Sequence, residues 1–421
     1  MVEGNAHAGE ATPEQVRSEV KSWLHREWDP DLALAEWREL LVRARWAVPS
    51  WPTQWYGRDL PLWADDVVAS EIRSAGAIGL PVGAGMSLAA PTILAHGPDA
   101  LRERFLLPTL TGAEKWCQLF SEPGAGSDLA GVSTKAVRDG DRWVVSGQKV
   151  WNTSAHHADF GILLARTDWE APKHRGITYF VIPMHQAGVE VRPLKQMNFH
   201  ASFNEVFLSE AEIPEEHVVG EVHQGWAVAL TTLNYERRFA SASRPNIPVS
   251  KGLALEQARD EAAEHFKTYE WYPQRAGRVD LLVEHARASG RANDPIVRQE
   301  LVKVLSLRDV SAWTAERARA QRALGRPPGA EGSIGKLASS NLARRASATH
   351  SLIAGANGML SGSDGAFEGI IGETLVSVPA VSIAGGTDEI QKNILAERVL
   401  GLPREPNTSN DIPFRDILRN A

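Results

Sequence analysis

The apolar residues of this 421-residue chain change their spacing twice, and this change limits the possible folds more than any other feature of the sequence. Over residues 12–111 they recur every three or four positions, as Val16 and Val20 do, which is the spacing of amphipathic helices. Over residues 116–219 they form short runs separated by Gly, Pro and Asp, which is typical of β-strands. Over residues 225–400 the helical spacing returns. We therefore expect helices, then strands, then helices.

The middle of the chain carries the pattern of a small β domain. Residues 135–137 and 143–145 flank an Asp-Gly pair, which predicts a β-hairpin. Further strand-like runs follow at 160–166, 177–183, 189–193 and 203–208. Runs at such regular spacing indicate a small barrel or sandwich.

Charge and cysteine content exclude several classes of protein. The net charge is −7, from 45 basic and 52 acidic residues without a basic block, so no nucleic-acid-binding patch is expected. The single cysteine, Cys117, excludes internal disulfides and favours a reducing compartment; we interpret it as a core thiol. The N-terminus lacks the basic start and apolar run of an export signal. The most apolar stretch, residues 76–95, contains two prolines and four glycines, which argues against a membrane span. We expect a cytoplasmic protein.

The segment Gln118-Leu-Phe-Ser-Glu-Pro-Gly-Ala-Gly-Ser-Asp128 lies where the helical spacing gives way to strands. Its small residues have free backbone amides, and with Ser127 they can approach a phosphate closely. Taken alone, such a turn is weak evidence, and a structural loop is the better interpretation.

Together with two later blocks, this segment resembles the acyl-CoA dehydrogenases. It matches the family's Ser/Thr-Glu-Pro-x-Ala-Gly-Ser-Asp pattern throughout. Residues 147–154, Gly-Gln-Lys-Val-Trp-Asn-Thr-Ser, are similar to the family's Gly-x-Lys-x-Trp-Ile-Thr-Asn strand, and residues 386–403 to its C-terminal helix. The α+β fold that this resemblance implies has an N-terminal α-helical domain over residues 1–113, a central β-barrel over residues 114–222 and a C-terminal four-helix bundle over residues 223–421.

The same resemblance implies FAD as the cofactor. The residues that it assigns to FAD are Gln118, Phe120 and Ser121 at the flavin ring, Gly126 and Ser127 at the pyrophosphate, Trp151 and Thr153 along the isoalloxazine and at its N5, Gly355, Asn357 and Gly358 near the adenine, and Thr387 and Glu389 near the ribose. A donor at N5 favours the reduced flavin. Without its neighbours, Trp151 would be interpreted as a core residue of a strand.

The catalytic base requires a choice between two positions. Many family members carry a glutamate in a Tyr-Glu-Gly-Thr turn, but here Gly385 takes that place. A minority supply it from the helix after the barrel, and Asn234-Tyr-Glu-Arg237 fits their pattern, which nominates Glu236. Independently, a helix with an apolar stripe through Trp226, Leu230 and Leu233 places Glu236 at the stripe's edge and Arg237 near its centre, so both should be partly buried. The alternative is an ordinary surface Glu-Arg pair.

The implied activity is α,β-desaturation of an acyl-CoA thioester. Glu236 would remove the α-proton, Arg237 would contact substrate, and the backbone amide of Gly385 would stabilise the thioester oxygen. The expected electron acceptor is an electron-transfer flavoprotein or an equivalent protein. Alternatives on the same fold are an acyl-CoA oxidase, a flavin monooxygenase, or a partner subunit that completes another chain's site.

The resemblance is weaker at the contacts that cross between subunits. The family's Arg-x-x-Phe-Gly block is not found between Arg238 and Arg298, and a conserved glutamine of the family is replaced by Leu352. These departures resemble a bacterial subgroup in which two different chains share each flavin, notably in steroid side-chain breakdown. The expected assembly is therefore a homodimer or homotetramer, or a heteromer with a related chain.

Overall fold

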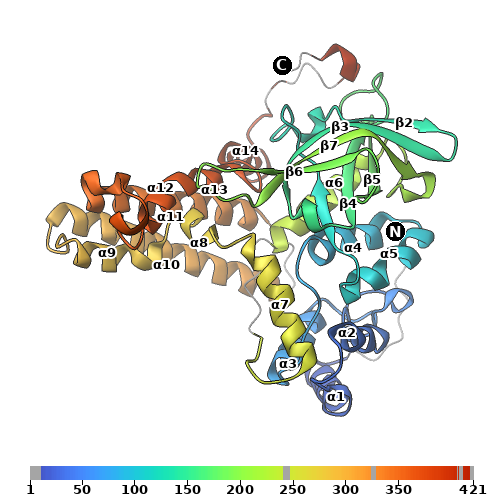
Figure 1. Cartoon of the computed structure of the whole chain (residues 1–421), viewed down its shortest axis with the longest axis horizontal. Helices are drawn as coiled ribbons and strands as arrows, with labels where there is room; N and C mark the ends of the chain where they lie inside the picture. The colour runs from blue at the N-terminus through green and yellow to red at the C-terminus, as the bar shows by residue number, and fades with distance from the viewer. Residues whose placement is uncertain (1–10, 240–246, 324–328, 405, 407–410, 418–421) are drawn as a thin grey trace. The chain divides into compact units, whose positions relative to one another are not determined.

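The computed structural model describes residues 11–239, 247–323, 329–404, 406 and 411–417. The chain forms two compact units. Unit 1 comprises Met1–Leu194, Phe203–Thr268 and Ser409–Ala421, and unit 2 comprises Lys195–Ser202 and Tyr269–Thr408. The predicted order of helices, strands and helices is confirmed (Figure 1). The domain limits at residues 113 and 222 stay predictions.

In the described part of unit 1, the first α-helices are α1 (Pro13–Glu27), α2 (Leu34–Arg43), α3 (Trp63–Ser74), α4 (Ala90–His96) and α5 (Asp99–Thr111). Thr12 begins α1 with a capping box, since its hydroxyl accepts from the Gln15 amide and the Gln15 side chain accepts from the Thr12 amide. Val16 and Val20 are buried in the core of these helices, as expected. In α2 the apolar spacing over Leu34, Trp37 and Leu40 predicts one buried face, but Leu40 is 40% exposed.

A seven-stranded curled sheet follows, with strands β1 (Trp116–Leu119), β2 (Lys135–Asp139), β3 (Arg142–Thr153), β4 (Phe160–Arg166), β5 (Ile177–Pro183), β6 (Val189–Leu194) and β7 (Phe203–Pro214). Its order is β1-β4-β2-β3-β7-β6, and β5 pairs with β4. The predicted hairpin is present, because Asp139 lies opposite Arg142 and Gly140 adopts φ +64° in the turn. Cys117 is fully buried, and burial raises the pKa of its thiol, so its interpretation as a core residue is confirmed.

After the sheet, unit 1 continues with the helices α6 (Gly225–Phe239) and α7 (Leu253–Lys267). The buried face of α6 differs from the predicted stripe, since Leu230 is 45% exposed while Thr232 is fully buried. The Thr232 hydroxyl lies 3.1 Å from the Tyr179 hydroxyl and 3.0 Å from that of Thr92, so hydrogen bonds compensate for burying a polar side chain.

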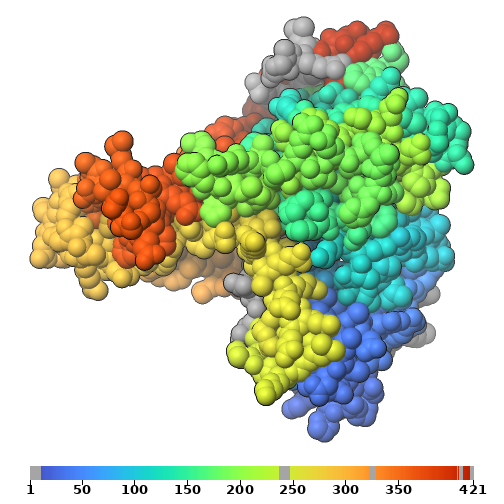
Figure 2. All heavy atoms as spheres, in the orientation of Figure 1, coloured from blue at the N-terminus to red at the C-terminus, as the bar shows by residue number. Residues whose placement is uncertain are grey.

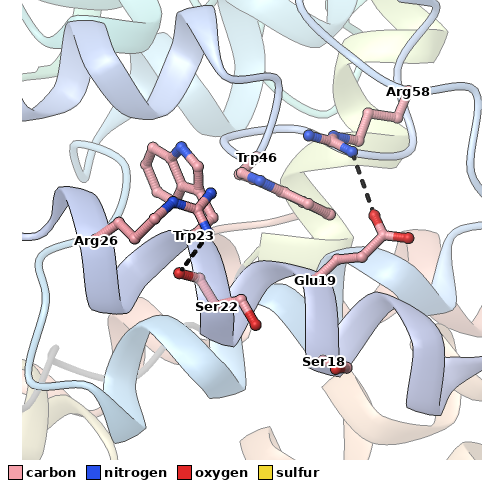
Figure 3. Close-up of a pocket in the computed structure, with 7 residues that line it drawn as sticks. All are labelled: Ser18, Glu19, Ser22, Trp23, Arg26, Trp46 and Arg58. Atoms are coloured by element: carbon pink, nitrogen blue, oxygen red, sulfur yellow. Dashed lines mark hydrogen bonds and ion pairs between the residues drawn. The ribbon is translucent and has the colours of Figure 1, made fainter.

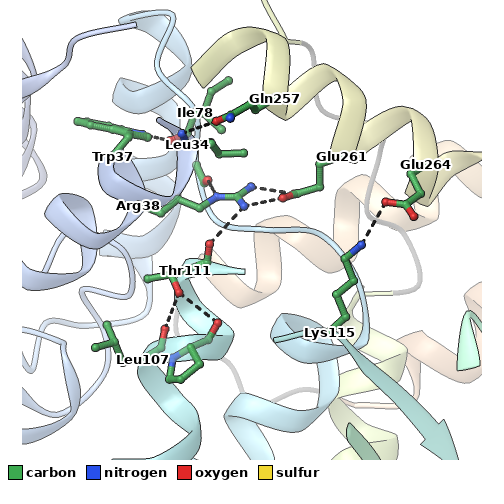
Figure 4. A network of polar contacts seen from close by, with 12 residues as sticks. Leu34, Trp37, Arg38, Ile78, Leu107, Thr111, Lys115, Gln257, Glu261 and Glu264 are labelled. Carbon is green, nitrogen blue, oxygen red and sulfur yellow. Dashed lines mark hydrogen bonds and ion pairs between the residues drawn. The ribbon is translucent and has the colours of Figure 1, made fainter. Parts of the chain in front are cut away.

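Helix α7 is held to the N-terminal helices by a polar network (Figure 4). Arg38 is 3% exposed, and its two terminal nitrogens donate to the Glu261 carboxylate at 2.6 and 2.8 Å. Gln257 accepts from the Leu34 amide at 2.8 Å. A bidentate Arg-carboxylate pair fixes geometry as well as charge, so this network sets the position of α7 within unit 1.

Unit 2 is mainly helical, with α8 (Tyr272–Arg275), α9 (Leu282–Ala288), α10 (Pro295–Ala323), α11 (Glu331–Ala354), α12 (Ile370–Ser377), α13 (Pro379–Ile383) and α14 (Asp388–Arg398). Its core joins Leu282 of α9, Val304 of α10 and Ala346 of α11. The loop Lys195–Ser202 belongs to this unit, because Asn198 donates to the Ser377 hydroxyl at 3.0 Å and Trp271 to that of Ser202 at 2.9 Å.

One stretch among the described residues, Ile370–Arg398, is long and apolar enough to cross a membrane, with a mean hydropathy of 1.3. In the structure it is divided into α12, α13 and α14, and Gly385 and Gly386 adopt φ +68° and +82° between the last two. A span requires roughly 20 residues of continuous helix. The stretch is therefore weak evidence for a span.

Candidate functional site

Strand β1 leads directly into the first predicted binding segment. Glu122 and Ala125 close a tight turn after the strand through two backbone hydrogen bonds, of 2.9 and 3.1 Å. Gly126 and Ser127 follow, and both are exposed. A Cβ added at Gly126 would meet nothing within 4 Å, so this turn leaves room for a ligand to approach the backbone.

Phe120 contributes to this segment differently from the other predicted residues. Its side chain is 4% exposed and meets the Tyr179 ring edge-on, with centroids 5.8 Å apart. The ring is thus part of the core of unit 1. Phe120 can meet a ligand through its backbone, whereas the prediction also included its side chain.

A buried ion pair joins the two predicted flavin segments. Lys149 is fully buried, and its ammonium lies 2.8 Å from the Glu122 carboxylate and 3.0 Å from the Phe120 carbonyl oxygen. Backbone amides of Ser133 and Thr134 also donate to Glu122, at 2.7 and 2.9 Å. Burial opposes ionisation of Glu122, but Lys149 and these hydrogen bonds lower the pKa of Glu122 to about 2. Burial lowers the pKa of Lys149, and the carboxylate acts in the opposite direction.

The roles of Glu122 and Lys149 were missed by sequence reasoning. Both residues lie inside the motifs that carried the resemblance, so the signal was present. A partner for each could have been sought because charged side chains in otherwise apolar strand segments are buried only when paired.

The end of β3 presents Trp151 through an irregular backbone. The pairing of β3 with β7 shifts register between Lys149 and Asn152, which is a β-bulge, and Trp151 lies in the left-handed region at φ +64°. Its side chain is 56% exposed and meets the Phe203 ring edge-on at 5.7 Å. Trp151 is therefore not a core residue of the strand in this structure. A bulky residue in this backbone region is uncommon and is often found at functional sites.

Hydrogen bonds fix this end of β3 to β1. The Val150 amide donates to the Ser121 carbonyl at 2.9 Å, and the Asn152 side-chain amide donates to the Gln118 carbonyl at 2.7 Å. Thr153 follows, opposite Phe203 of β7. Within the described residues, the Thr153 hydroxyl makes no hydrogen bond, so it can bind a ligand.

Helix α6 brings Glu236 to the same place. The Gln118 side-chain amide donates to the Glu236 carboxylate, with 3.4 Å between Nε2 and Oε2. Glu236 is partly buried, as predicted. Arg237 is the next residue of the helix, and its side chain lies outside the part of the chain that the structure describes. The nominated base and a nominated flavin residue are thus neighbours, although 118 positions separate them in the sequence.

Six predicted residues belong to unit 2, namely Gly355, Asn357, Gly358, Gly385, Thr387 and Glu389. Asn357 is exposed and Gly358 is partly buried, both in the helical turn Gly355–Met359. Thr387 is the N-cap of α14, since its hydroxyl accepts from the Ile390 amide at 3.3 Å. Gly385 is exposed, and its carbonyl accepts from the Gln391 side chain at 3.3 Å. Glu389 is exposed, and Gly355 is exposed at φ +56° at the end of α11. Gly385, Thr387 and Glu389 therefore lie close together at the start of α14. The predicted residues of unit 1 lie close to one another, at the ends of β1, β3 and α6.

A hollow of about 380 Å³ beside α1 involves none of the predicted residues (Figure 3). Trp23, Trp46 and Arg26 line it, together with Arg58. The Arg58 guanidinium lies 3.4 Å from the centre of the Trp46 ring and 3.7 Å from the Glu19 carboxylate, so its charge already has partners. Among the described residues, no group of His, Cys, Asp and Glu could hold a metal ion.

Comparison with known proteins identifies relatives over nearly the whole chain. Family models match the N-terminal domain of acyl-CoA dehydrogenases at residues 7–113, the middle domain at 117–210 and the C-terminal domain at 275–400. The chain is 33% identical over 415 residues to acyl-CoA dehydrogenase IpdE1 of Mycobacterium tuberculosis, covering 93% of this chain and 98% of that protein. It is 36% identical over 356 residues to acyl-CoA dehydrogenase FadE34 of the same organism, covering 85% of this chain but only 44% of that protein.

Solved structures show the same fold. The ChsE4-ChsE5 complex from Mycobacterium tuberculosis contains a chain that is 25% identical with a TM-score of 0.63, covering 93% of this chain and 98% of that one. The Tcur3481-Tcur3483 steroid ACAD gives a TM-score of 0.63 at 23% identity, with the same coverage. These matches confirm the predicted three-domain plan of helices, sheet and helices.

Proposed function

Since the chain belongs to the acyl-CoA dehydrogenase family, we propose that it desaturates an acyl-CoA thioester between its α and β carbons, with FAD as cofactor and Glu236 as base. The observation that supports this most directly is the 3.4 Å contact between the Glu236 carboxylate and the Gln118 amide. Of the two positions where the family carries its base, only Glu236 is a carboxylate here, since the other is Gly385. Through this contact Glu236 lies next to the end of β1, where the flavin motif begins.

The residues of unit 1 fit a flavin nucleotide. The open turn at Gly126 and Ser127 suits a pyrophosphate, because backbone amides there can approach an anion without a side chain between them. Trp151 presents an exposed ring, and Thr153 a hydroxyl, on the adjoining strand end. When bound, FAD would supply the acceptor for the hydride that leaves the β carbon.

Glu236 would take the α-proton. For this role a carboxylate must be held in one orientation within hydrogen-bond reach of the proton. The Gln118 side chain supplies such an orienting contact, and packing of α6 through Val228 and Thr232 fixes the helix itself. Arg237 is proposed to contact the substrate.

The turn at Gly385 would stabilise charge on the thioester oxygen. Gly385 carries no carboxylate that could serve as base, but its amide remains, and backbone amides are effective donors to a developing oxyanion. Thr387 caps α14 immediately after this turn, which fixes the backbone that presents the amide. Thr387 and Glu389 are proposed to lie at the FAD ribose, and Gly355 near the adenine.

We also propose the partners. The substrate is an acyl-CoA, and the acceptor is an electron-transfer flavoprotein or an equivalent protein. The relative ChsE4-ChsE5 is a complex of two named chains, and this chain departs from the family at Leu352, so its assembly is either a homo-oligomer or a pair with a related chain. Mass measurement of the purified protein, alone and with related chains from its source, distinguishes these assemblies.

The test is anaerobic titration of the Glu236→Gln variant with a panel of CoA thioesters, from short linear to steroid-bearing. The variant should remain yellow but lose flavin bleaching, with a rate of flavin reduction at least about 100-fold below wild type, because a positioned base contributes roughly 10²–10⁴ in rate. Glu256→Gln, an exposed position on α7, is the matched control. Near-normal bleaching by Glu236→Gln would refute the assignment, and rapid peroxide formation by wild type in air would favour an oxidase.

A further inference from the structure

The C-terminal segment of the chain docks on the sheet domain of unit 1. Residues 411–417 lie against the loop between β4 and β5, and in Figure 2 these last described residues touch the atoms of that domain. The Phe414 amide donates to the Ala171 carbonyl at 3.0 Å, and the Arg415 amide donates to the Trp169 carbonyl at 3.1 Å. Phe414 is 2% exposed, so its ring is the anchor of the segment.

The Phe414 ring covers a buried arginine. Arg166 ends β4 with no exposed surface, and its guanidinium carbon lies 3.5 Å from the centre of the Phe414 ring. A guanidinium over an aromatic face is attracted by the ring quadrupole, more strongly when water is excluded. The Trp169 ring also meets Phe414, with centroids 5.4 Å apart.

The edges of the same guanidinium hold the segment that follows the proposed pyrophosphate turn. Arg166 donates to the Ala130 carbonyl at 2.6 Å and to the Val132 carbonyl at 3.2 Å. It also donates to the Lys173 carbonyl at 2.8 Å, while the Lys173 ammonium contacts the Asp128 carboxylate at 2.9 Å. Asp128 directly follows Ser127 in the chain. One buried cation therefore connects the C-terminal segment to residues 128–132, which directly follow the turn at Gly126 and Ser127.

We propose that residues 411–417 act as a strap that fixes the FAD pyrophosphate turn through Arg166, so that FAD affinity depends on the docking of these residues. This inference rests on the proposed FAD site. Phe414 is a positioning residue, because it acts through Arg166 rather than on the cofactor. By thermodynamic reciprocity, if docking strengthens FAD binding, then FAD strengthens docking by the same factor.

The experiment compares FAD affinity of stripped apo-protein across full-length variants, by quenching of flavin fluorescence. Phe414→Ala should raise the Kd for FAD by about tenfold, since it removes the ring from the guanidinium and opens a cavity beside it. Phe414→Tyr keeps the ring face and should restore most of the affinity. Ile412→Ala, at a position 38% exposed in the same segment, should leave the Kd unchanged.

Hydrogen exchange on the wild-type protein gives a second measurement that needs no variant. The amides of Phe414 and Arg415 should exchange about tenfold more slowly with FAD bound, as reciprocity requires. Unchanged exchange on adding FAD, or an unchanged Kd in a folded Phe414→Ala variant, would overturn the strap while leaving the proposed function intact. Wild-type apo-protein that binds no FAD would overturn the proposed function and the strap with it.

Discussion

Each compact unit buries a pair of titratable side chains, and the two pairs are built in opposite ways. In unit 1 the Glu122–Lys149 pair is charged, and backbone amides complete the bonding of its carboxylate. In unit 2, His285 of α9 and His350 of α11 are both buried, with 3.0 Å between their Nδ1 atoms. The pair in unit 1 joins two proposed flavin segments, whereas the histidines join helices of the unit 2 core.

The hydrogen bonds of the histidine pair can be satisfied with both rings neutral. His350 Nε2 lies 3.1 Å from the Arg278 carbonyl oxygen, which can only accept, so Nε2 carries a hydrogen. The Nδ1 atom of neutral His350 must then accept from the Nδ1–H of His285. Burial lowers the pKa of His350 to about 4, and His285 adds a smaller effect in the same direction. The hydrogen bond to the Arg278 carbonyl raises the pKa but is outweighed. Burial also lowers the pKa of His285.

This difference predicts which kind of change, substitution or acid, destabilises each unit. The charged pair is stable while both members are present, because removing one leaves an uncompensated buried charge. The neutral pair is stable while no proton is added. Substitution should therefore damage unit 1 most, and mild acid should damage unit 2 first.

The largest effect is expected from Lys149→Met. It leaves the Glu122 carboxylate buried with only its hydrogen-bond donors, which should reduce the free energy of unfolding by about 3–5 kcal/mol. Urea denaturation followed by tryptophan fluorescence measures this. The double variant Glu122→Gln, Lys149→Met should lose less than the sum of the single losses, because it removes the unpaired charge. Additive losses would show that the pair is not coupled.

The second prediction concerns acid. The folded pKa of His350 lies below the unfolded value near 6.5, so the unfolded state binds more protons between these values. The stability contributed by neutral His350 is fully present above pH 6.5 and is lost as the pH falls to about 4, by about 3 kcal/mol in total. Glu122 affects stability at lower pH, because its folded pKa of about 2 lies below its usual pKa of 4.5. The stability that its carboxylate contributes is lost by protonation as the pH falls between these two values.

The measurement for this second prediction is the pH dependence of unfolding between pH 7 and 4.5. His350→Gln cannot titrate at this position, so its stability should change less steeply over the range than that of wild type, whatever its stability at pH 7. Equal slopes in the two proteins would contradict the assignment of the acid sensitivity to His350.

The sequence predicted the fold well where local signals decide it. Strand β4 and strand β5 begin and end where the short apolar runs predicted, and the Asp-Gly pair marked the hairpin, because apolar runs and the turn residues between them are local properties. The stripe on α6 was wrong at Leu230. There the buried position is Thr232, whose hydroxyl has partners in α4 and β5, and such partners are set by tertiary packing.

In the candidate site too, some residues could be identified from sequence motifs, whereas others depend on tertiary packing. Gln118, Gly126 and Trp151 could be nominated because their motifs resemble those of the acyl-CoA dehydrogenases. The sequence could indicate that Glu122 and Lys149 each need a partner, but not that they pair with each other, because this depends on strand register. The contact between Phe414 and Arg166 could not be predicted, because it depends on where residues 411–417 return to the sheet domain. The placement of Glu236 beside Gln118 required both kinds of information, a motif to nominate it and a packed helix to deliver it.

The smallest effect is expected at Asp280, which tests whether the histidine pair responds to its surroundings. Its carboxylate lies 2.8 Å from the Arg278 guanidinium but is 64% exposed, so removing this ion pair should change stability at pH 7 by no more than about 0.5 kcal/mol. Asp280 also acts to raise the pKa of His350, so Asp280→Asn should move the acid transition of the histidine pair to slightly lower pH. Titration of the His350 ring by NMR in the two proteins measures this shift. An unchanged titration would mean that Asp280 does not reach the histidine pair, and that the core of unit 2 is isolated from surface charge.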